Sequence, residues 1–228
     1  MDTAQFQAPP WEDIDTVMFD MDGTLLDLHF DNHFWQEVIP RHYADTHGVS
    51  VEQAVAIMES KHSEARGTIR WYCLEYWRGE LDLDITGIKH QVKHKIAVRP
   101  NVVELLERLQ QTDKRVLLIT NADPYNLNMK MEVTGIEGYF HRLISSHTLH
   151  LAKENHGFWQ KLKQMEHYDP ARTLLFDDSA FVLRQARREG IRHLYAIQKP
   201  DSQKPAVSHE EFPVVADFRD TLTSALPG

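Results

Sequence analysis

The sequence predicts an α/β fold, with a Rossmann-like parallel sheet core that carries helices on both faces and an inserted all-helical cap. From residue 99 onward, short apolar runs typical of buried strands alternate with amphipathic helical patterns, as in chains that form parallel sheets. The first apolar run, residues 16–19, is separated from the others by a long stretch of helical character. We therefore expect residues 1–27 and 99–228 to form the core and residues 28–98 to form the cap.

Each element of this fold has its own signature in the chain. The apolar runs predict strands at residues 16–19, 114–120, 142–146, 173–178 and 192–197. In the core, amphipathic patterns predict helices at residues 101–112, 155–165 and 179–190, with Gly190 ending the last, and a shorter helical stretch follows residue 121. In the cap, they predict helices at residues 51–65 (with Ser50 as N-cap), 68–81 and 87–98. The composition predicts a loose arm at residues 1–13 and a surface loop at residues 198–213.

Composition narrows the class of protein and of partner. With 42% hydrophobic and 26% charged residues among 228, the chain has the usage of an ordinary globular protein. Its net charge of -9 lacks the bulk electrostatic footprint for nucleic acid or an anionic membrane, so we expect a small-molecule partner. Cys73 is the single cysteine, which excludes an internal disulfide and a cysteine-based zinc site. No secretory leader and no membrane-spanning apolar run is visible, and we expect the protein in the cytoplasm.

Polar side chains follow three of the predicted strands, where each strand ends. Because ligands bind outside the carboxyl ends of open parallel sheets, we expect these residues to converge on one edge; they are Asp20, Asp22, Thr120, Asn121, Asp177 and Asp178. Four carboxylates in one place need a cation, and oxygen ligands without cysteine favour Mg²⁺. The alternative to a metal site is that these residues form ordinary turns, since Asp, Gly and Thr are turn residues. An EF-hand is excluded, because counting from Asp20 places Leu25 at loop position 6 and Asp31 at position 12.

These motifs resemble a known superfamily. The segment Asp20-Met21-Asp22-Gly23-Thr24, the pair Thr120-Asn121, Lys153 and the pair Asp177-Asp178 stand in the order and spacing of the haloacid dehalogenase-like superfamily. The opening "FDMDGTLLDLHFDNHFW" resembles the bacterial GMP/IMP nucleotidase branch of that superfamily. The resemblance implies a Mg²⁺-dependent phosphomonoesterase with an aspartyl-phosphate intermediate, and a 5′-nucleotidase that hydrolyses purine monophosphates.

The resemblance also assigns roles to the matching residues. Asp20 would be the nucleophile, and Asp22 the general acid and base whose backbone carbonyl binds Mg²⁺. Thr120, Asn121 and Lys153 would bind the phosphoryl oxygens, with Thr120 and Lys153 counted among the catalytic residues. Asp178 would bind Mg²⁺ directly, and Asp177 directly or through water. The chain departs from the usual pattern twice: Glu154 stands where a proline commonly follows the lysine, and Val182 stands where many members carry an acid.

An aromatic and basic cluster stands out in the predicted cap. Its members Arg66, Arg70, Trp71 and Tyr72, with Tyr76 and Trp77 after them, are candidates for substrate contact. Aromatic side chains at helical spacing equally suit the interior of the cap. The expectation of a purine substrate therefore comes from the resemblance and not from this cluster.

Besides a nucleotidase, three other interpretations of the site are considered. A sugar-phosphate phosphatase or hexose-phosphate mutase would share every core residue with a nucleotidase. A carbon–halogen hydrolase needs neither the metal nor the acid at Asp22, so the complete acid set argues against it. A phospho-ligand-binding module without catalysis would be expected to have lost at least one of Asp20, Asp22 or Asp178.

Overall fold

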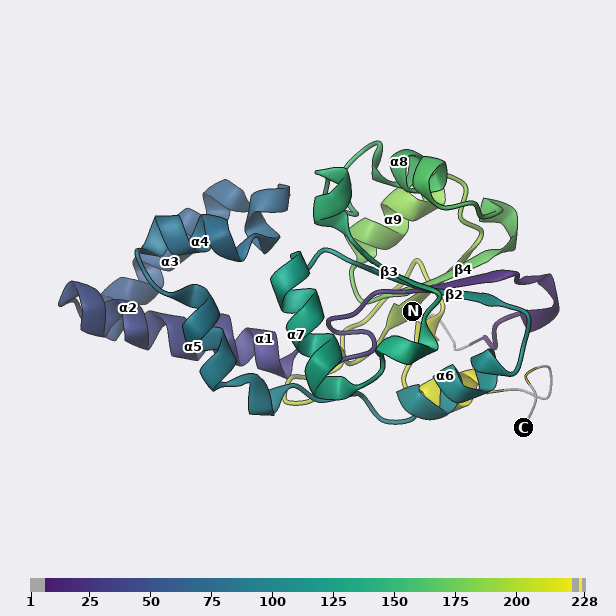
Figure 1. The fold of residues 1–228 in the computed structure, drawn as a ribbon, viewed down its shortest axis with the longest axis horizontal. Coiled ribbons are helices and arrows are strands. Elements are labelled where there is room, and N and C mark those ends of the chain that lie inside the picture. Colours follow the sequence, from purple (N-terminus) through teal and green to yellow (C-terminus); the bar gives the residue numbers. More distant parts are fainter. Residues whose placement is uncertain (1–6, 223–225, 227–228) are drawn as a thin grey trace.

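The computed structural model describes residues 7–222 and residue 226, and its centre is a parallel sheet (Figure 1). Within these residues six strands lie in the order β3-β2-β1-β4-β5-β6, and every neighbouring pair is parallel. The strands are β1 (Thr16–Phe19), β2 (Arg115–Thr120), β3 (Arg142–Ser145), β4 (Thr173–Asp177), β5 (His193–Ile197) and β6 (Val214–Val215). The predicted α/β fold is confirmed, and the short edge strand β6 is an addition that no apolar run indicated.

Helices cover both faces of the sheet, as predicted. Residues of β1 alternate between the faces: Val17 and Phe19 pack with α6 (Val102–Gln110) and α7 (Pro124–Thr134), and Met18 packs toward α8 (Phe158–Met165) and α9 (Ala180–Arg188). Because both faces are buried, the strands contain nearly continuous apolar runs instead of alternating with polar residues. This burial is why the strands could be located from sequence.

A helical insertion separates β1 from β2 and has an apolar centre of its own. It contains α1 (His29–His33), a π-helical turn at Phe34–Val38, α2 (Ile39–His47), α3 (Val51–Ala65), α4 (Leu74–Leu81) and α5 (Ile85–Gln91). Its buried cluster includes Phe34, Ile85 and Trp77, the last 1% exposed. The prediction for α3 is confirmed to the residue, because Ser50 forms a capping box with Gln53. In Figure 1 the insertion, coloured blue, extends to one side of the sheet.

Three local predictions were wrong. Residues 68–81 do not form one helix: a 3-10 turn at Ile69–Tyr72 precedes an extended Cys73, and α4 starts at Leu74. The chain breaks there because the Leu74 amide donates to Asp123 Oδ2 at 2.8 Å, a contact with the core. Residues 87–98 are helical to Gln91 and continue as a 3-10 turn at Lys93–Lys95.

The third correction concerns the N-terminal arm. Residues 1–6 lie outside the described residues, but Trp11–Asp13 form a 3-10 turn instead of a loose arm. Trp11 is 1% exposed, and its indole Nε1 donates to the Thr221 carbonyl at 2.8 Å. Burying so large an apolar ring outweighs the loop character of the prolines before it.

The two chain segments that join the insertion to the sheet pair with each other. Leu26 and Val98 form an antiparallel bridge, and the Asp27 amide donates to the Ala97 carbonyl at 2.9 Å. The Asp27 carboxylate accepts hydrogen bonds from the amides of His29 and Ser202, so it is a structural residue of this linker. Among the helices of the described residues, none is long and apolar enough to cross a membrane.

Candidate active site

The site lies where the connections of the sheet reverse direction. From β1 the chain runs outward to β2 and β3, and from β4 it runs outward to β5 and β6 in the opposite sense. A parallel sheet has its ligand crevice at such a point, beyond the carboxyl ends of the strands. Asp20 directly follows β1, Thr120 ends β2 and Asp177 ends β4. The sheet therefore brings these predicted site residues to one edge.

Three carboxylates meet at this edge. One oxygen each from Asp20, Asp177 and Asp178 lies within 4.8 Å of the other two. Burial and repulsion from Asp20 and Asp177 hold the pKa of Asp178 well above its usual range, and burial raises the pKa of Asp20 to about 6. Within the part of the chain that the structure describes, the Asp178 carboxylate has no hydrogen-bond or ion-pair partner. Hard oxygen ligands in mutual repulsion are a donor set that fits Mg²⁺.

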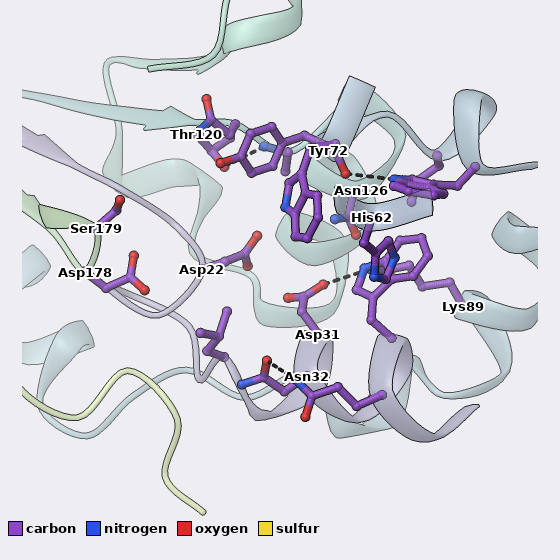
Figure 2. A pocket seen from close by; sticks show the side chains of 18 of the residues that line it. Asp22, Asp31, Asn32, His62, Tyr72, Lys89, Thr120, Asn126, Asp178 and Ser179 are labelled. Carbon is purple, nitrogen blue, oxygen red and sulfur yellow. Dashed lines mark hydrogen bonds and ion pairs between the residues drawn. The ribbon is translucent and has the colours of Figure 1, made fainter. Parts of the chain in front are cut away.

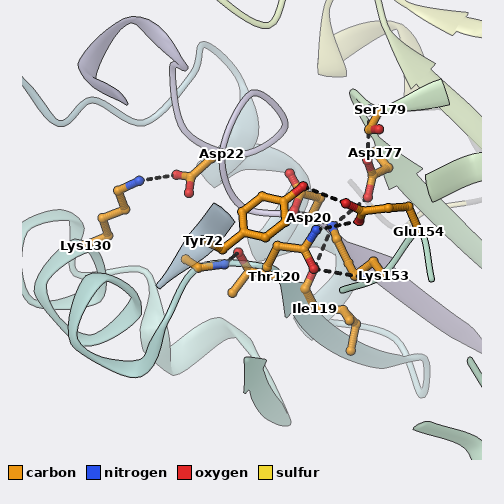
Figure 3. A network of polar contacts seen from close by, with 12 residues as sticks. Asp20, Asp22, Tyr72, Ile119, Thr120, Lys130, Lys153, Glu154, Asp177 and Ser179 are labelled. Atoms are coloured by element: carbon orange, nitrogen blue, oxygen red, sulfur yellow. Dashed lines mark hydrogen bonds and ion pairs between the residues drawn. The ribbon is translucent and has the colours of Figure 1, made fainter. Parts of the chain in front are cut away.

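Lys153 supplies a fixed positive charge to the same cluster (Figure 3). Its ammonium lies 2.5 Å from Asp20 Oδ1, 2.7 Å from Asp177 Oδ2 and 3.2 Å from the Ile119 carbonyl. Despite complete burial, these two carboxylates raise the pKa of Lys153 above its ordinary value. With all four groups ionised, one ammonium leaves an excess of negative charge among three carboxylates, which a bound cation would offset.

Gly23 makes room for the Asp178 carboxylate. Its φ of +82° lies in the left-handed region, and a Cβ there would stand 2.6 Å from Asp178 Oδ2. The glycine after Asp22 is therefore required both for the turn and for the close approach of Asp178.

Asp22 lies in the site but outside the cluster of three carboxylates. Its Oδ1 accepts from the Lys130 ammonium at 2.5 Å, and Lys130 also donates to Asp31 Oδ2 at 2.5 Å. Asp31 Oδ1 in turn accepts from Lys89 at 2.8 Å. Asp22 therefore lines the same cavity as the other three aspartates, but a buried lysine holds its side chain outside their close cluster. Burial still raises the pKa of Asp22 to about 6.

Thr120 and Asn121 are held by hydrogen bonds of ordinary length. Thr120 Oγ1 accepts from the Ala122 amide at 3.0 Å, and Asn121 Oδ1 accepts from the Lys153 amide at 2.9 Å. Asn121 Nδ2 donates to Glu154 Oε2 at 2.9 Å, and the Tyr72 hydroxyl donates to Glu154 Oε1 at 2.9 Å (Figure 3). Glu154, which stands where a proline is common, therefore connects the core to the insertion.

A cavity of about 650 Å³ lies between the carboxylate cluster and the insertion (Figure 2). The core side contributes all of the predicted residues Asp20, Asp22, Thr120, Asn121, Lys153, Asp177 and Asp178. The insertion contributes aromatic and polar side chains: Trp35, Trp71, Trp77, Tyr72, His62, Asp31, Asn32, Gln36 and Lys89. Of the four predicted substrate residues, Trp71 and Tyr72 line the cavity. Arg66 and Arg70 are exposed and lie outside its described lining, with the Arg66 guanidinium 5.7 Å from the centre of the Trp71 ring.

Four charged residues of the ion-pair and hydrogen-bond network around the site were not predicted as site residues from the sequence. They are Asp31, Lys89, Lys130 and Glu154, of which the two lysines are almost completely buried. A weak signal exists for Lys130, since Met129 and Met131 flank it and a lysine between apolar residues of a helix is unusual. Asp31 similarly follows Phe30 and sits among aromatic residues.

Comparison with known proteins identifies the family. The model of the haloacid dehalogenase-like hydrolases matches residues 14–190. The chain belongs to this family. The GMP/IMP nucleotidase YrfG of Escherichia coli (strain K12) is 36% identical over 216 residues, which cover 95% of this chain and 97% of the relative. The same identity and coverage hold for the GMP/IMP nucleotidase YrfG of Shigella flexneri. Together the family and these relatives support an enzyme of the phosphoric monoester hydrolase class.

Solved structures share the fold at low sequence identity. A HAD phosphatase from Thermococcus onnurineus superposes with a TM-score of 0.74 at 19% identity, covering 91% of this chain and 95% of that one. The L-2-haloacid dehalogenase from Xanthobacter autotrophicus with covalently bound chloropropionic acid gives a TM-score of 0.56 at 16% identity, over 83% of this chain and 80% of that one. These likenesses establish the fold of the family.

Proposed function

We propose that this hydrolase is a Mg²⁺-dependent phosphomonoesterase that forms a phosphate ester on Asp20, and that its substrates are purine nucleoside 5′-monophosphates such as GMP and IMP. The observation that carries the proposal is the meeting of Asp20, Lys153, Asp177 and Asp178 at the end of a cavity of about 650 Å³. This arrangement supplies a nucleophilic carboxylate, a fixed cation and a set of oxygen ligands within one small volume.

In the first step, a carboxylate oxygen of Asp20 bonds to phosphorus while the ester P–O bond breaks. The electron pair of that bond stays on the leaving oxygen, which takes a proton from Asp22. In the second step, Asp22 removes a proton from water, the water oxygen bonds to phosphorus, and the bond from phosphorus to Asp20 breaks. Inorganic phosphate and the free Asp20 carboxylate result, so the enzyme is regenerated.

Three residues would hold the phosphoryl group during both steps. Lys153 lies within 2.5 Å of Asp20 Oδ1 and is placed to neutralise the oxygens next to the nucleophile. The Thr120 hydroxyl lines the cavity and can donate, because its hydrogen bond with the Ala122 amide uses it as an acceptor. The Asn121 side chain is occupied on both sides by Lys153 and Glu154, which leaves its backbone N–H as the donor.

The oxygens of Asp20, Asp177 and Asp178, with the Asp22 backbone carbonyl, are the groups that would hold Mg²⁺. When bound, the ion would lower the repulsion between the attacking carboxylate and the phosphoryl oxygens. The excess of carboxylates over Lys153 and the unpartnered state of Asp178 among the described residues support this assignment. The three aspartates would keep the ion beside the nucleophile.

The insertion would select the leaving group. A purine base matches a wall of aromatic rings, which the cavity offers in Trp35, Trp71 and Trp77. The GMP/IMP nucleotidase relatives support the same choice of substrate. We keep Trp71 and Tyr72 as substrate contacts, whereas Arg66 and Arg70 reach a bound nucleotide only if they leave the surface positions they occupy. We also place the enzyme in the cytoplasm, because a chain with a single cysteine cannot form an internal disulfide and is suited to a reducing compartment.

A phosphate-release screen tests this proposal. GMP, IMP, AMP, glucose 6-phosphate and glucose 1-phosphate are compared with Mg²⁺ and with EDTA, and Asp20→Asn is the inactive control. We expect release from GMP and IMP that stops with EDTA and returns with Mg²⁺. A preference for the sugar phosphates would contradict the purine assignment alone, whereas release that continues in EDTA would contradict the metal site.

A further inference from the structure

A buried chain of alternating charges connects Asp22 to the insertion. Lys130 on α7 contacts both Asp22 and Asp31 at 2.5 Å, and Lys89 on α5 contacts Asp31 at 2.8 Å. The two lysines are each 1% exposed at their side chains, while Asp31 is 15% exposed. Two ammonium groups thus balance two carboxylates in a largely buried region, where an unpaired charge would be strongly destabilising.

Lys130 acts from outside the cavity. It is not among the described residues that line the cavity, whereas Asp22 is, so Lys130 reaches a bound substrate only through Asp22. Its ammonium also lies 5.3 Å from the centre of the Phe30 ring, which fills the space beside it. The side chain is therefore held in one place by two carboxylates and an aromatic face.

The contact fixes one oxygen of Asp22 and leaves the other available. Lys130 donates to Oδ1, and no protein group among the described residues donates to Oδ2. Figure 3 shows Asp22 with Lys130 on one side and the Asp20 group on the other, and Figure 2 shows its carboxylate directed into the cavity. A cation at Oδ1 makes Oδ2 the oxygen that exchanges a proton with the leaving group.

We propose that Lys130 is a positioning residue, which holds the Asp22 carboxylate so that Oδ2 meets the leaving oxygen of the ester. This inference rests on the proposed function, because it assigns a partner to the general acid of that reaction. Asp31 holds Lys130 from the side of the insertion, and Lys89 in turn holds Asp31. A general acid contributes about 10²- to 10⁴-fold to the rate, and a displacement of about 1 Å can remove 10²-fold of such an effect.

Two esters that differ in their leaving group test the role of Lys130. Phenyl phosphate needs protonation of its leaving oxygen, whereas p-nitrophenyl phosphate, which differs by one nitro group on the ring, releases a stabilised anion that departs without a proton. The quantity compared is kcat/KM, which reports the steps up to departure of the phenol. We expect Lys130→Met to lower kcat/KM about 10- to 100-fold for phenyl phosphate and less than about threefold for p-nitrophenyl phosphate.

Matched variants separate positioning from a general loss of stability. Met131→Ala truncates a buried neighbour on the same helix and is expected to lower thermal stability without changing the ratio between the two esters. Lys130→Arg restores a cation and should recover part of the selective loss. Adding Lys130→Met to Asp22→Ala should cause no further selective loss, because Lys130 acts through Asp22. If Lys130→Met fails to fold, Lys130→Gln, which keeps a polar donor, provides the same comparison.

The outcomes distinguish this inference from the proposed function. Equal losses for the two esters in Lys130→Met, or an added selective loss in the Asp22→Ala background, would overturn the role of Lys130 while leaving a phosphatase. If the unsubstituted protein releases phosphate from neither ester nor from any nucleotide, the proposed function is wrong and the inference is wrong with it.

Discussion

Replacing Gly23 by alanine is expected to displace the Asp178 carboxylate and weaken Mg²⁺ binding. An added Cβ would stand 2.6 Å from Asp178 Oδ2, 2.8 Å from Asp178 Cγ and 3.1 Å from Pro200 Cβ. Carbon contacts are comfortable at about 3.5 Å or more, so Asp178 must withdraw by about 1 Å. Mg²⁺ requires near-ideal ligand distances, and a ligand displaced this far no longer coordinates. The positive φ adds a separate backbone cost of about 1–2 kcal/mol for any residue with a Cβ.

Gly135→Ala is the matched control for the backbone cost. Gly135 has a φ of +67°, but nothing among the described residues lies within 4 Å of the position of its Cβ. Both variants should therefore lose about 1–2 kcal/mol of unfolding free energy, or roughly 2–8 °C in a protein of this size.

The two variants are expected to differ in Mg²⁺ binding. In Gly23→Ala, the Mg²⁺ concentration that gives half-maximal phosphate release should rise by about 10- to 100-fold, the range seen when support of a metal ligand is lost. Isothermal titration calorimetry and the dependence of activity on Mg²⁺ concentration measure the Mg²⁺ affinity. Thermal unfolding measures the backbone cost that the two variants share. An unchanged Mg²⁺ dependence in Gly23→Ala, or an equal change in Gly135→Ala, would refute the reasoning.

Three further predictions address the nucleophile, the closing contact and the buried ion pairs. Asp20→Asn should abolish phosphate release while the circular dichroism spectrum and thermal midpoint persist; full activity would sink the nucleophile assignment. Tyr72→Phe removes the hydroxyl that donates to Glu154 at 2.9 Å, and we expect KM to rise by up to about tenfold in steady-state kinetics, with an unchanged KM as the contrary result. Two lysines, Lys130 and Lys89, lower the pKa of Asp31 to about 2 from 3.8, although burial opposes them, so Asp31 stabilises the fold above about pH 4 and this stabilisation disappears as pH falls toward 2. We therefore compare the free energies of unfolding in urea of Asp31→Asn and of the unsubstituted protein. Their difference should shrink by about 2 kcal/mol as the pH falls from about 4 to about 2, and a constant difference would contradict the ion-pair assignment.

Much of the fold could be predicted because its physical causes are local. A parallel sheet buried on both faces requires continuous apolar runs, and β1, β2 and β4 have them. The capping box of α3 is also written within four consecutive residues. The break at Cys73 is different, because it depends on Asp123, which lies 49 residues from Leu74 in the chain. No pattern inside the segment contains that information.

The site shows the same division between local and long-range causes. Polar residues at strand ends predict that Asp20 and Asp177 are neighbours, since β1 and β4 lie side by side. The partner of Asp22 could not be predicted in this way, because Lys130 lies 108 residues further along the chain and on a helix. A buried lysine looks like a surface lysine in a sequence until its carboxylate partners are placed around it.

The paired linkers have a mechanical consequence for how the enzyme admits its substrate. Two linker segments that are paired through the bridge at Leu26 and Val98 resist sliding past each other, and they leave rotation about their common axis as the easy movement. On the other rim, residues 67–74 contact the core through Gly67, Tyr72 and Leu74. We therefore expect the insertion to open as a hinged lid that closes again onto the same contacts with the core. In the reaction we propose, such a lid would let the leaving group depart after the first step while Asp20, Lys153 and the proposed metal ligands, all on the sheet side, keep their mutual alignment for the attack by water.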